Sequence, residues 1–380
     1  MHSENNFVHN FLNIIHSAAI AILILAGLAE SHAQDTLSLC FMGDVMVHSR
    51  QIEYARQKDS TYDFSSCFSQ IHKQLQQADI AVANMEFTLA GKPYTGYPQF
   101  SAPDEMISQL AADGFDVLLA ANNHIYDKGA EGTARTHQML KKAQEKYGIL
   151  FCGLAGSKEE RDSTTPLIIK KEGFTIALIN FTYGTNLGAQ SHWPKTNYES
   201  EKEMLKAAFE KAREEGAEII IALPHWGEEY VLHHSERQEQ TAKWLVENGA
   251  DIIIGSHPHV VQDFGTIKQG KDSTEVPVAY SLGNAVSNMS AANTQIGLIA
   301  TVRVARSQDG TAKILPVVFT YTWCSRPGGY NNSYTVIPVK ENLETRSQWV
   351  GEWEYDKMKR TYYHILQETG IPDGITEVLN

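Results

Sequence analysis

Apolar segments of strand length alternate with amphipathic segments of helix length along most of this 380-residue chain. The apolar runs with the length of a strand lie at residues 36–42, 80–83, 117–121, 176–181, 219–223 and 252–254. Segments between them carry apolar residues at helical spacing, at residues 103–113, 130–147, 200–215 and 236–248. Because helices that alternate with strands cover a sheet with much parallel pairing, the sequence predicts an α/β fold.

The pattern of the chain changes after residue 256. Further strand candidates follow without a long helix between them, at residues 260–264, 276–282, 297–304 and 312–322. We therefore expect antiparallel strands that complete a second sheet. Residues 341–368 return to helical spacing. Since the chain shows no internal repeat and no linker, we expect one domain over residues 34–340 and a helical C-terminal extension, residues 341–380, packed on it.

The N-terminal residues have features of a secretory signal peptide. A short apolar run at residues 18–29 is followed by Ser31-His32-Ala33, which offers small residues to a signal peptidase. Residues 1–33 contain no Lys or Arg, so a buried or membrane-anchoring helix is the alternative. We expect a signal peptide over residues 1–33 and export to the periplasm or the cell exterior, where the protein could associate with the cell surface. After cleavage no transmembrane helix is expected.

Composition and charge exclude one class of partner. The apolar fraction of 42% and charged fraction of 20% are typical of a globular protein. The net charge is −13 at pH 7, and Lys and Arg form no basic block. Because a general nucleic-acid binder needs a basic surface that displaces counterions, we expect no nucleic-acid partner.

Polar residues that could bind a metal follow most of the expected strands. After the first, second, third, fifth and sixth strands these residues are Asp44, Glu86, Asn123 with His124, His225, and His257 with His259. In open α/β sheets, ligands bind at the carboxyl ends of the strands, where the connecting loops are free of core packing. This shared position predicts a single site at one edge of the fold.

The types of these residues point to divalent metals. A lone histidine is more often a buried residue bonded to backbone, but two imidazoles one residue apart after a buried strand favour a metal. Carboxylate, amide and neutral imidazole ligands suit Mn²⁺, Fe²⁺ or Zn²⁺. Since the candidate ligands outnumber those of one tetrahedral ion, we expect two ions bridged by a carboxylate, which activate water for hydrolysis. These ligands are Asp44, Glu86, Asn123, His225, His257 and His259.

The same motifs resemble a known family. They read GDVM at 43–46, NMEF at 84–87, ANNH at 121–124 with DKG at 127–129, HWGEEY at 225–230, GSHPHVVQ at 255–262 and YSLGN at 280–284. In this order they resemble the bacterial CapA capsule-synthesis family, linked to poly-γ-glutamate, over about residues 37–305. That family is similar to calcineurin-like metallophosphoesterases. The resemblance therefore implies a four-layer α/β/β/α sandwich of two mixed sheets flanked by helices, with two metals.

Carried over residue by residue, the resemblance implies a role for each candidate. Asp44 takes the place of the first metallophosphoesterase aspartate, Glu86 that of the bridging carboxylate, and Asn123 that of the amide ligand. His124 takes the place of the histidine that assists the leaving group or stabilises the charge of the transition state, so Asp44 and His124 are the expected catalytic residues. The remaining metal ligands are His225, His257 and His259.

The chain departs from the metallophosphoesterase pattern at two ligand positions. The Asp-x-His of that pattern is Asp44-Val45-Met46 here, so one histidine ligand is absent. The bridging aspartate is replaced by the longer Glu86. These departures bear on whether both metal sites are occupied, and on phosphatase activity in particular.

Other residues of the motifs are candidates for substrate contact, namely Asn84, Asn122, Trp226, Glu228 and Asn284. Trp226 and Glu228 are expected to shape the pocket wall, and Glu228 could orient a ligand histidine. Asn122 has the alternative role of a turn former.

Three functions fit these features. The first is an exported metal-dependent hydrolase of capsule or poly-γ-glutamate metabolism, acting on an anionic extracellular polymer or γ-glutamyl substrate. The second is a non-catalytic, metal-binding accessory subunit of the capsule synthesis or export machinery, which the missing ligand at Met46 favours. The third is a secreted phosphoesterase, which rests on fold analogy alone.

Overall fold

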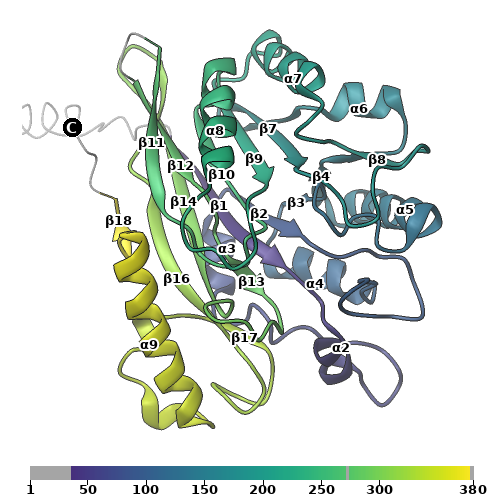
Figure 1. Cartoon of the computed structure of the whole chain (residues 1–380), viewed down its shortest axis with the longest axis vertical. Helices are drawn as coiled ribbons and strands as arrows, with labels where there is room; N and C mark the ends of the chain where they lie inside the picture. Colours follow the sequence, from purple (N-terminus) through teal and green to yellow (C-terminus); the bar gives the residue numbers. More distant parts are fainter. Residues whose placement is uncertain (1–35, 271–273, 377–380) are drawn as a thin grey trace, which may run out of the picture.

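Two mixed β-sheets form the centre of the protein, and helices cover their outer faces (Figure 1). The computed structural model describes residues 36–270 and 274–376, so the expected signal peptide at residues 1–33 lies outside the described residues. Two layers of helices and two sheets give the α/β/β/α order that the family resemblance implies. The expected α/β sandwich is therefore confirmed.

The larger sheet is built around its long strand β1 (Thr36–Val45). On one side β1 pairs in parallel with β2, which is followed by β3 and β4, also parallel. On the other side it pairs antiparallel with β14, followed by β16 and β17. These strands are β2 (Ile80–Met85), β3 (Val117–Leu119), β4 (Leu150–Cys152), β14 (Ile296–Arg306), β16 (Val318–Ser325) and β17 (Thr335–Pro338). Three short strands pair alongside: β13 (Asn284–Val286), β15 (Ala312–Ile314) and β18 (Gly374–Ile375).

The second sheet has the order β11-β12-β10-β9-β7-β6. Its four inner strands are parallel, and the edge strands β11 and β6 run antiparallel to their neighbours. The strands are β6 (Leu167–Lys171), β7 (Phe174–Thr182), β9 (Ile219–His225), β10 (Ile252–Ile254), β11 (Phe264–Gln269) and β12 (Thr274–Ala279). A separate pair joins β5 (Leu154–Ala155) to β8 (Lys195–Thr196).

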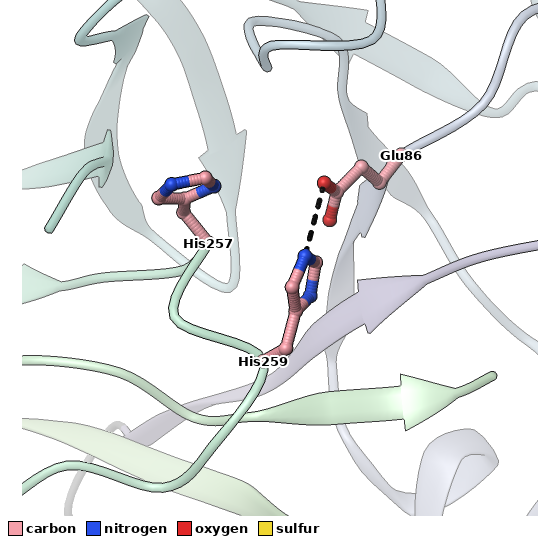
Figure 2. A group of neighbouring side chains, drawn as sticks. All are labelled: Glu86, His257 and His259. Carbon is pink, nitrogen blue, oxygen red and sulfur yellow. Dashed lines mark ion pairs between the residues drawn. The ribbon is translucent and has the colours of Figure 1, made fainter. Parts of the chain in front are cut away.

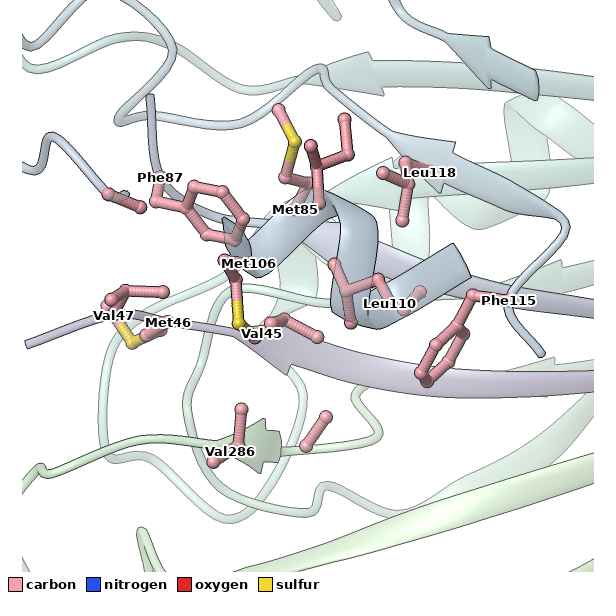
Figure 3. Close-up of a cluster of buried hydrophobic side chains, with 14 of the residues drawn as sticks. Val45, Met46, Val47, Met85, Phe87, Met106, Leu110, Phe115, Leu118 and Val286 are labelled. Carbon is pink, nitrogen blue, oxygen red and sulfur yellow. The ribbon is translucent and has the colours of Figure 1, made fainter. Parts of the chain in front are cut away.

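Helices pack against the outer face of each sheet. The larger sheet is covered by α3 (His72–Gln77), α4 (Glu105–Asp113) and α5 (Gly129–Tyr147), and Figure 3 shows part of this core, including Leu110 of α4 beside Leu118 of β3. The second sheet is covered by α7 (Lys202–Glu214) and α8 (Glu236–Asn248). Short helices α2 (Ser49–Ala55) and α6 (Lys158–Thr164) lie in the connections. Among the described residues, no helix has both the length and the apolar composition needed to cross a bilayer.

The core between the sheets explains why the strands are apolar on both faces. Leu39 and Phe41 of β1 point to the second sheet, where they meet residues such as Leu178 of β7 and Ile221 of β9. Cys40, between them in sequence, belongs to the core under the helices. Because successive side chains alternate between faces, a strand buried on both sides needs a continuous apolar run.

The late strands differ from the expected arrangement. We expected the strands after residue 256 to complete the second sheet, but only β11 and β12 join it. β14 and β16 extend the larger sheet instead, because Ala300 pairs with Phe41 and continues the apolar face of β1. The expected strand at 260–264 is also wrong: β11 begins at Phe264.

The C-terminal part adds to the core between the sheets. Helix α9 (Glu352–Thr369) follows the short helices η1 (Lys340–Asn342) and η2 (Arg346–Gln348) and lies along β16 (Figure 1). Met358 and Ile365 of α9 pack in the same cluster as Phe319 and Tyr321 of β16. α9 therefore covers a part of the larger sheet's inner face that the second sheet does not cover.

Two glycines allow the strand ends near the candidate site to come close together. A Cβ on Gly43 would lie 1.8 Å from the Gly283 carbonyl oxygen, which accepts a hydrogen bond from the Asp44 N–H at 3.0 Å. A Cβ on Gly255 would lie 2.2 Å from the Tyr280 carbonyl oxygen. Any side chain at either position would force backbone segments apart.

We predict that Gly43→Ala lowers the free energy of unfolding by about 1–3 kcal/mol, the usual cost of overpacking a core. Gly265→Ala is the matched control, because a Cβ there meets no atom within 4 Å, and its effect should stay within about 0.5 kcal/mol. Urea unfolding of both variants measures the difference. Equal stability of the two would contradict the close approach at Gly43.

Candidate metal centre

The candidate ligands converge from both sheets, at the carboxyl ends of their strands. Asp44 is the penultimate residue of β1, and Glu86 follows β2 directly. His225 is the last residue of β9, and His257 and His259 lie in the turns after β10. The two sheets thus meet at one edge, as the strand-end pattern of the sequence predicts.

Glu86 lies at the centre of this group. Its side chain is fully buried, and its Oε1 lies 3.7 Å from His259 Nε2, 3.8 Å from His225 Nε2 and 4.0 Å from His124 Nε2. These distances are too long for hydrogen bonds. Neither carboxylate oxygen has a hydrogen-bond partner among the described residues. Figure 2 shows Glu86 facing His259, with His257 beside them.

The electrostatics of the site fit a divalent cation. Burial, and then the charges of Asp44 and Glu229, raise the pKa of Glu86 well above its usual range. Burial and the neighbouring imidazoles lower the pKa of His225 and His257 well below theirs, so both rings stay neutral. A buried carboxylate without a partner is costly, and neutral imidazole is the form that binds metal ions.

Two overlapping sets of side chains could hold a metal ion. One consists of Glu86, His257 and His259, and the other of Asp44, Glu86 and His225. Within each set the ligand atoms all lie within 4.8 Å of one another. His257 Nδ1, like the Glu86 oxygens, has no hydrogen-bond partner in the part of the chain described. The buried residues therefore fit a divalent metal, with Glu86 common to both sets.

Amide side chains hold the ligands in place. Asn84 donates to Asp44 Oδ1 at 2.7 Å, and the His257 N–H donates to Asp44 Oδ2 at 3.2 Å. Asn284 Oδ1 lies 3.0 Å from His259 Nδ1, which leaves His259 Nε2 facing Glu86. Asn84 and Asn284, which we expected to contact substrate, are buried and contact the candidate ligands Asp44 and His259. Such outer contacts fix the orientation of metal ligands.

Asn123 and His225 also contact each other. Asn123 Oδ1 lies 3.0 Å from His225 Nε2, and His225 Nδ1 lies 3.1 Å from the Ser256 hydroxyl. Both side chains are buried at the cluster. The structure thus brings Asn123 together with the predicted ligands, with its amide oxygen directed at the ring nitrogen that faces Glu86.

His124 is positioned by a residue to which the sequence assigned no role. Asp127 Oδ2 lies 2.7 Å from His124 Nδ1 and also accepts a hydrogen bond from the Phe100 N–H at 2.7 Å. The Phe100 ring packs edge-on against the imidazole. With Nδ1 occupied, His124 presents Nε2 to the site. The spacing of three residues between His124 and Asp127 is the signal that could have identified this pair.

Two of the expected substrate-contact residues have structural roles instead. Asn122 donates to the Met85 carbonyl at 2.8 Å and accepts from the His124 N–H at 3.1 Å, so its amide shapes the loop. Trp226 is buried under α7 and α8 and donates to the Tyr280 carbonyl. Since side chains alternate along an extended chain, Trp226 faces away from the site that His225 enters.

Glu228 and Met46 also lie apart from the ligands. Glu228 is exposed. The charge of the next residue, Glu229, reaches the cluster: burial first, and then this charge, raise the pKa of Tyr183. Met46, at the position of the absent histidine ligand, is buried in the apolar cluster with Val47 and Phe87 shown in Figure 3. The side chain at that position therefore packs in the apolar core and is not directed at the candidate metal ligands.

We predict that Mn²⁺ or Zn²⁺ stabilises the protein and that Glu86→Gln removes this effect. At a metal concentration 100-fold above Kd, a single site should add about 2.7 kcal/mol to the unfolding free energy. In metal-free protein, Glu86→Gln should raise Tm, because it removes a buried carboxylate without partners.

The matched control is Asp113→Asn, which changes another buried carboxylate with an unpartnered oxygen, outside the cluster. It should keep the full metal response. Thermal unfolding with and without a chelator, combined with elemental analysis, measures both quantities. A metal response that survives in Glu86→Gln would place the metal elsewhere.

Comparison with known proteins supports the family relationship. The family model described as "Bacterial capsule synthesis protein PGA_cap" matches residues 38–289. The "Capsule biosynthesis protein CapA" of Bacillus anthracis is 30% identical over 294 residues, which cover 75% of this chain and 67% of that protein. The "PGA biosynthesis protein CapA" of Bacillus subtilis (strain 168) is 26% identical over 303 residues, 76% of this chain and 73% of that protein.

Solved structures show a more distant similarity. The Haemophilus influenzae NAD nucleotidase (NadN) is 13% identical with a TM-score of 0.46, over 87% of this chain and 62% of that chain. A 5'-nucleotidase precursor from Thermus thermophilus is 13% identical with a TM-score of 0.48, over 87% of this chain and 58% of that chain. At these values the similarity carries no information about substrate. The family match, by contrast, spans more than half of the chain and every predicted ligand, so the protein belongs to the PGA_cap family of bacterial capsule synthesis proteins.

Proposed function

We propose that this protein is an exported, metal-dependent hydrolase of capsule or poly-γ-glutamate metabolism that cleaves an anionic polymer or a γ-glutamyl substrate. The observation that carries the proposal is the buried, unpartnered Glu86 shared by two sets of ligand side chains in the described part of the chain. The names of the CapA relatives support the substrate class. Export rests on the apolar run at residues 18–29.

In this proposal two divalent ions, Mn²⁺, Fe²⁺ or Zn²⁺, are held by Asp44, Glu86, Asn123, His225, His257 and His259. When bound, such ions lower the pKa of water and stabilise negative charge on the oxygen of the bond that is attacked. The protein supplies a buried site that excludes bulk solvent. Asn84 and Asn284 keep Asp44 and His259 in the orientation that binding needs.

His124 is the proposed proton donor to the leaving group. Its Nδ1 proton is held by Asp127, so Nε2 is free to carry and transfer a proton inside the site. The contact with Asp127 fixes the orientation of the imidazole ring, so that Nε2 faces the candidate ligands. The same chemistry serves an amide nitrogen or a phosphoester oxygen as leaving group.

We predict that Asp127→Asn lowers kcat by about 10²–10⁴-fold, the usual contribution of general acid catalysis, while metal content is unchanged. Asp263→Asn is the matched control, because Asp263 makes the same kind of contact with His234 Nδ1, at 2.6 Å, away from the cluster. Steady-state kinetics and elemental analysis of both variants provide the test. Equal activity of the two variants would exclude this role for His124.

The proposal itself is tested by a substrate screen on the mature chain, residues 34–380, loaded with Mn²⁺, Fe²⁺ or Zn²⁺. We expect release of new amino groups from γ-linked glutamate oligomers, and we expect His257→Ala to lose both metal and activity. Phosphate release from phosphoesters alone would favour the secreted phosphoesterase. Unchanged metal content in His257→Ala would contradict the assigned centre.

A non-catalytic accessory subunit of capsule polymer synthesis or export is the second candidate. It is favoured by Met46, which fills the absent histidine's position with an apolar side chain. Stoichiometric binding of the oligomers to metal-loaded protein, without turnover on any substrate of the screen, would support this function over the hydrolase.

A further inference from the structure

Strand β7 contributes to the site although none of the predicted ligands follows it in the sequence. The predicted ligands follow other strands, whereas β7 (Phe174–Thr182) is followed by Tyr183 and Asn186. Both residues are exposed, and both lie against side chains of the metal centre. They are therefore placed between the buried cluster and solvent.

The ring of Tyr183 lies beside two of the histidines. Its centroid lies 4.6 Å from that of His257 and 6.4 Å from that of His225, to whose ring it is nearly parallel. The residue is nevertheless 36% exposed. One face thus packs on the metal centre while part of the ring is open to a ligand.

Asn186 lies over the ring of His124. Its amide nitrogen is 3.3 Å from Nδ1 and 3.4 Å from Nε2, so it sits above the ring and not in line with one nitrogen. Nδ1 is already held by Asp127 at 2.7 Å. The amide protons of Asn186 therefore remain available to an oxygen beside the proposed proton donor.

The loop that carries both residues is anchored to the site by its backbone. The Tyr183 N–H donates to the His225 carbonyl and the Asn186 N–H to the Asn123 carbonyl, each at 2.9 Å. The Thr185 hydroxyl donates to the Gly188 carbonyl at 2.8 Å and lies 3.0 Å from the Tyr198 hydroxyl. A contact surface held in place before binding loses little entropy when a ligand arrives.

We propose that Tyr183 and Asn186 bind the substrate on the solvent side of the metal centre. Asn186 donates a hydrogen bond to a carbonyl or carboxylate oxygen next to His124, and Tyr183 packs against the apolar methylene groups of the neighbouring unit. A γ-linked glutamate chain offers both features, since its peptide oxygens alternate with methylene groups and carboxylates. This inference rests on the proposed function and specifies which residues contact the substrate.

The test measures binding of a synthetic γ-linked glutamate tetramer to the Mn²⁺-loaded mature protein by calorimetry. Every protein carries Asp127→Asn, so that turnover does not obscure binding. We expect Tyr183→Ala and Asn186→Ala each to raise Kd about tenfold, as loss of one good contact does. Tyr147→Ala, which removes a tyrosine of similar exposure at the end of α5, should leave Kd unchanged.

Mn²⁺ stoichiometry and Tm are measured on the same samples and should equal those of the parent in all variants, which separates loss of contact from loss of structure. If the parent binds the tetramer and Tyr183→Ala and Asn186→Ala bind it equally well, this inference is overturned while the proposed function stands. If the parent binds Mn²⁺ but no tetramer, the proposed substrate class fails, and this inference fails with it. Loss of Mn²⁺ in Tyr183→Ala and Asn186→Ala would also overturn it, because the two residues would then support the metal centre.

Discussion

The burial of the Glu86 carboxylate is the constraint on which the rest of the site depends. An ionised carboxylate without partners costs several kcal/mol inside a protein, and a bound cation would offset that cost. The protein surrounds Glu86 with three imidazoles and a second carboxylate, Asp44, at distances that suit shared ligation better than hydrogen bonding. The geometry of the cluster therefore fits a metal-binding site, with Glu86 common to both ligand sets.

The fold makes this arrangement possible by bringing the carboxyl ends of two sheets to one edge. Gly43 and Gly255 remove the Cβ atoms that would keep the strand ends apart. His257 and His259 adopt positive φ angles of 103° and 60°, which residues with side chains rarely tolerate. The His257 N–H is held by Asp44, so the ligand set itself stabilises the backbone conformation that presents it.

The sequence predicted the parts of the structure that follow from strand position. Asp44, Glu86, His225, His257 and His259 meet because parallel strands end at the same edge. The prediction that β14 and β16 belong to the second sheet was wrong, because either sheet could have accepted their apolar faces. The roles of Trp226, Asp127 and Tyr183 depend on which way each side chain points and on neighbours distant in sequence, and no local pattern encodes those contacts. The family resemblance identified the candidate ligands. It did not identify the residues that orient or cover these side chains.

The most direct test of the metal centre is the position of metal ions in crystals of the mature protein grown with Zn²⁺, located by anomalous diffraction. We expect two peaks roughly 3.5–4 Å apart, one on each side of the Glu86 carboxylate, with Zn–O distances of about 2.0–2.2 Å. Peaks that lack Glu86 as a ligand, or a Glu86 carboxylate that contacts only water in metal-bound crystals, would contradict this expectation.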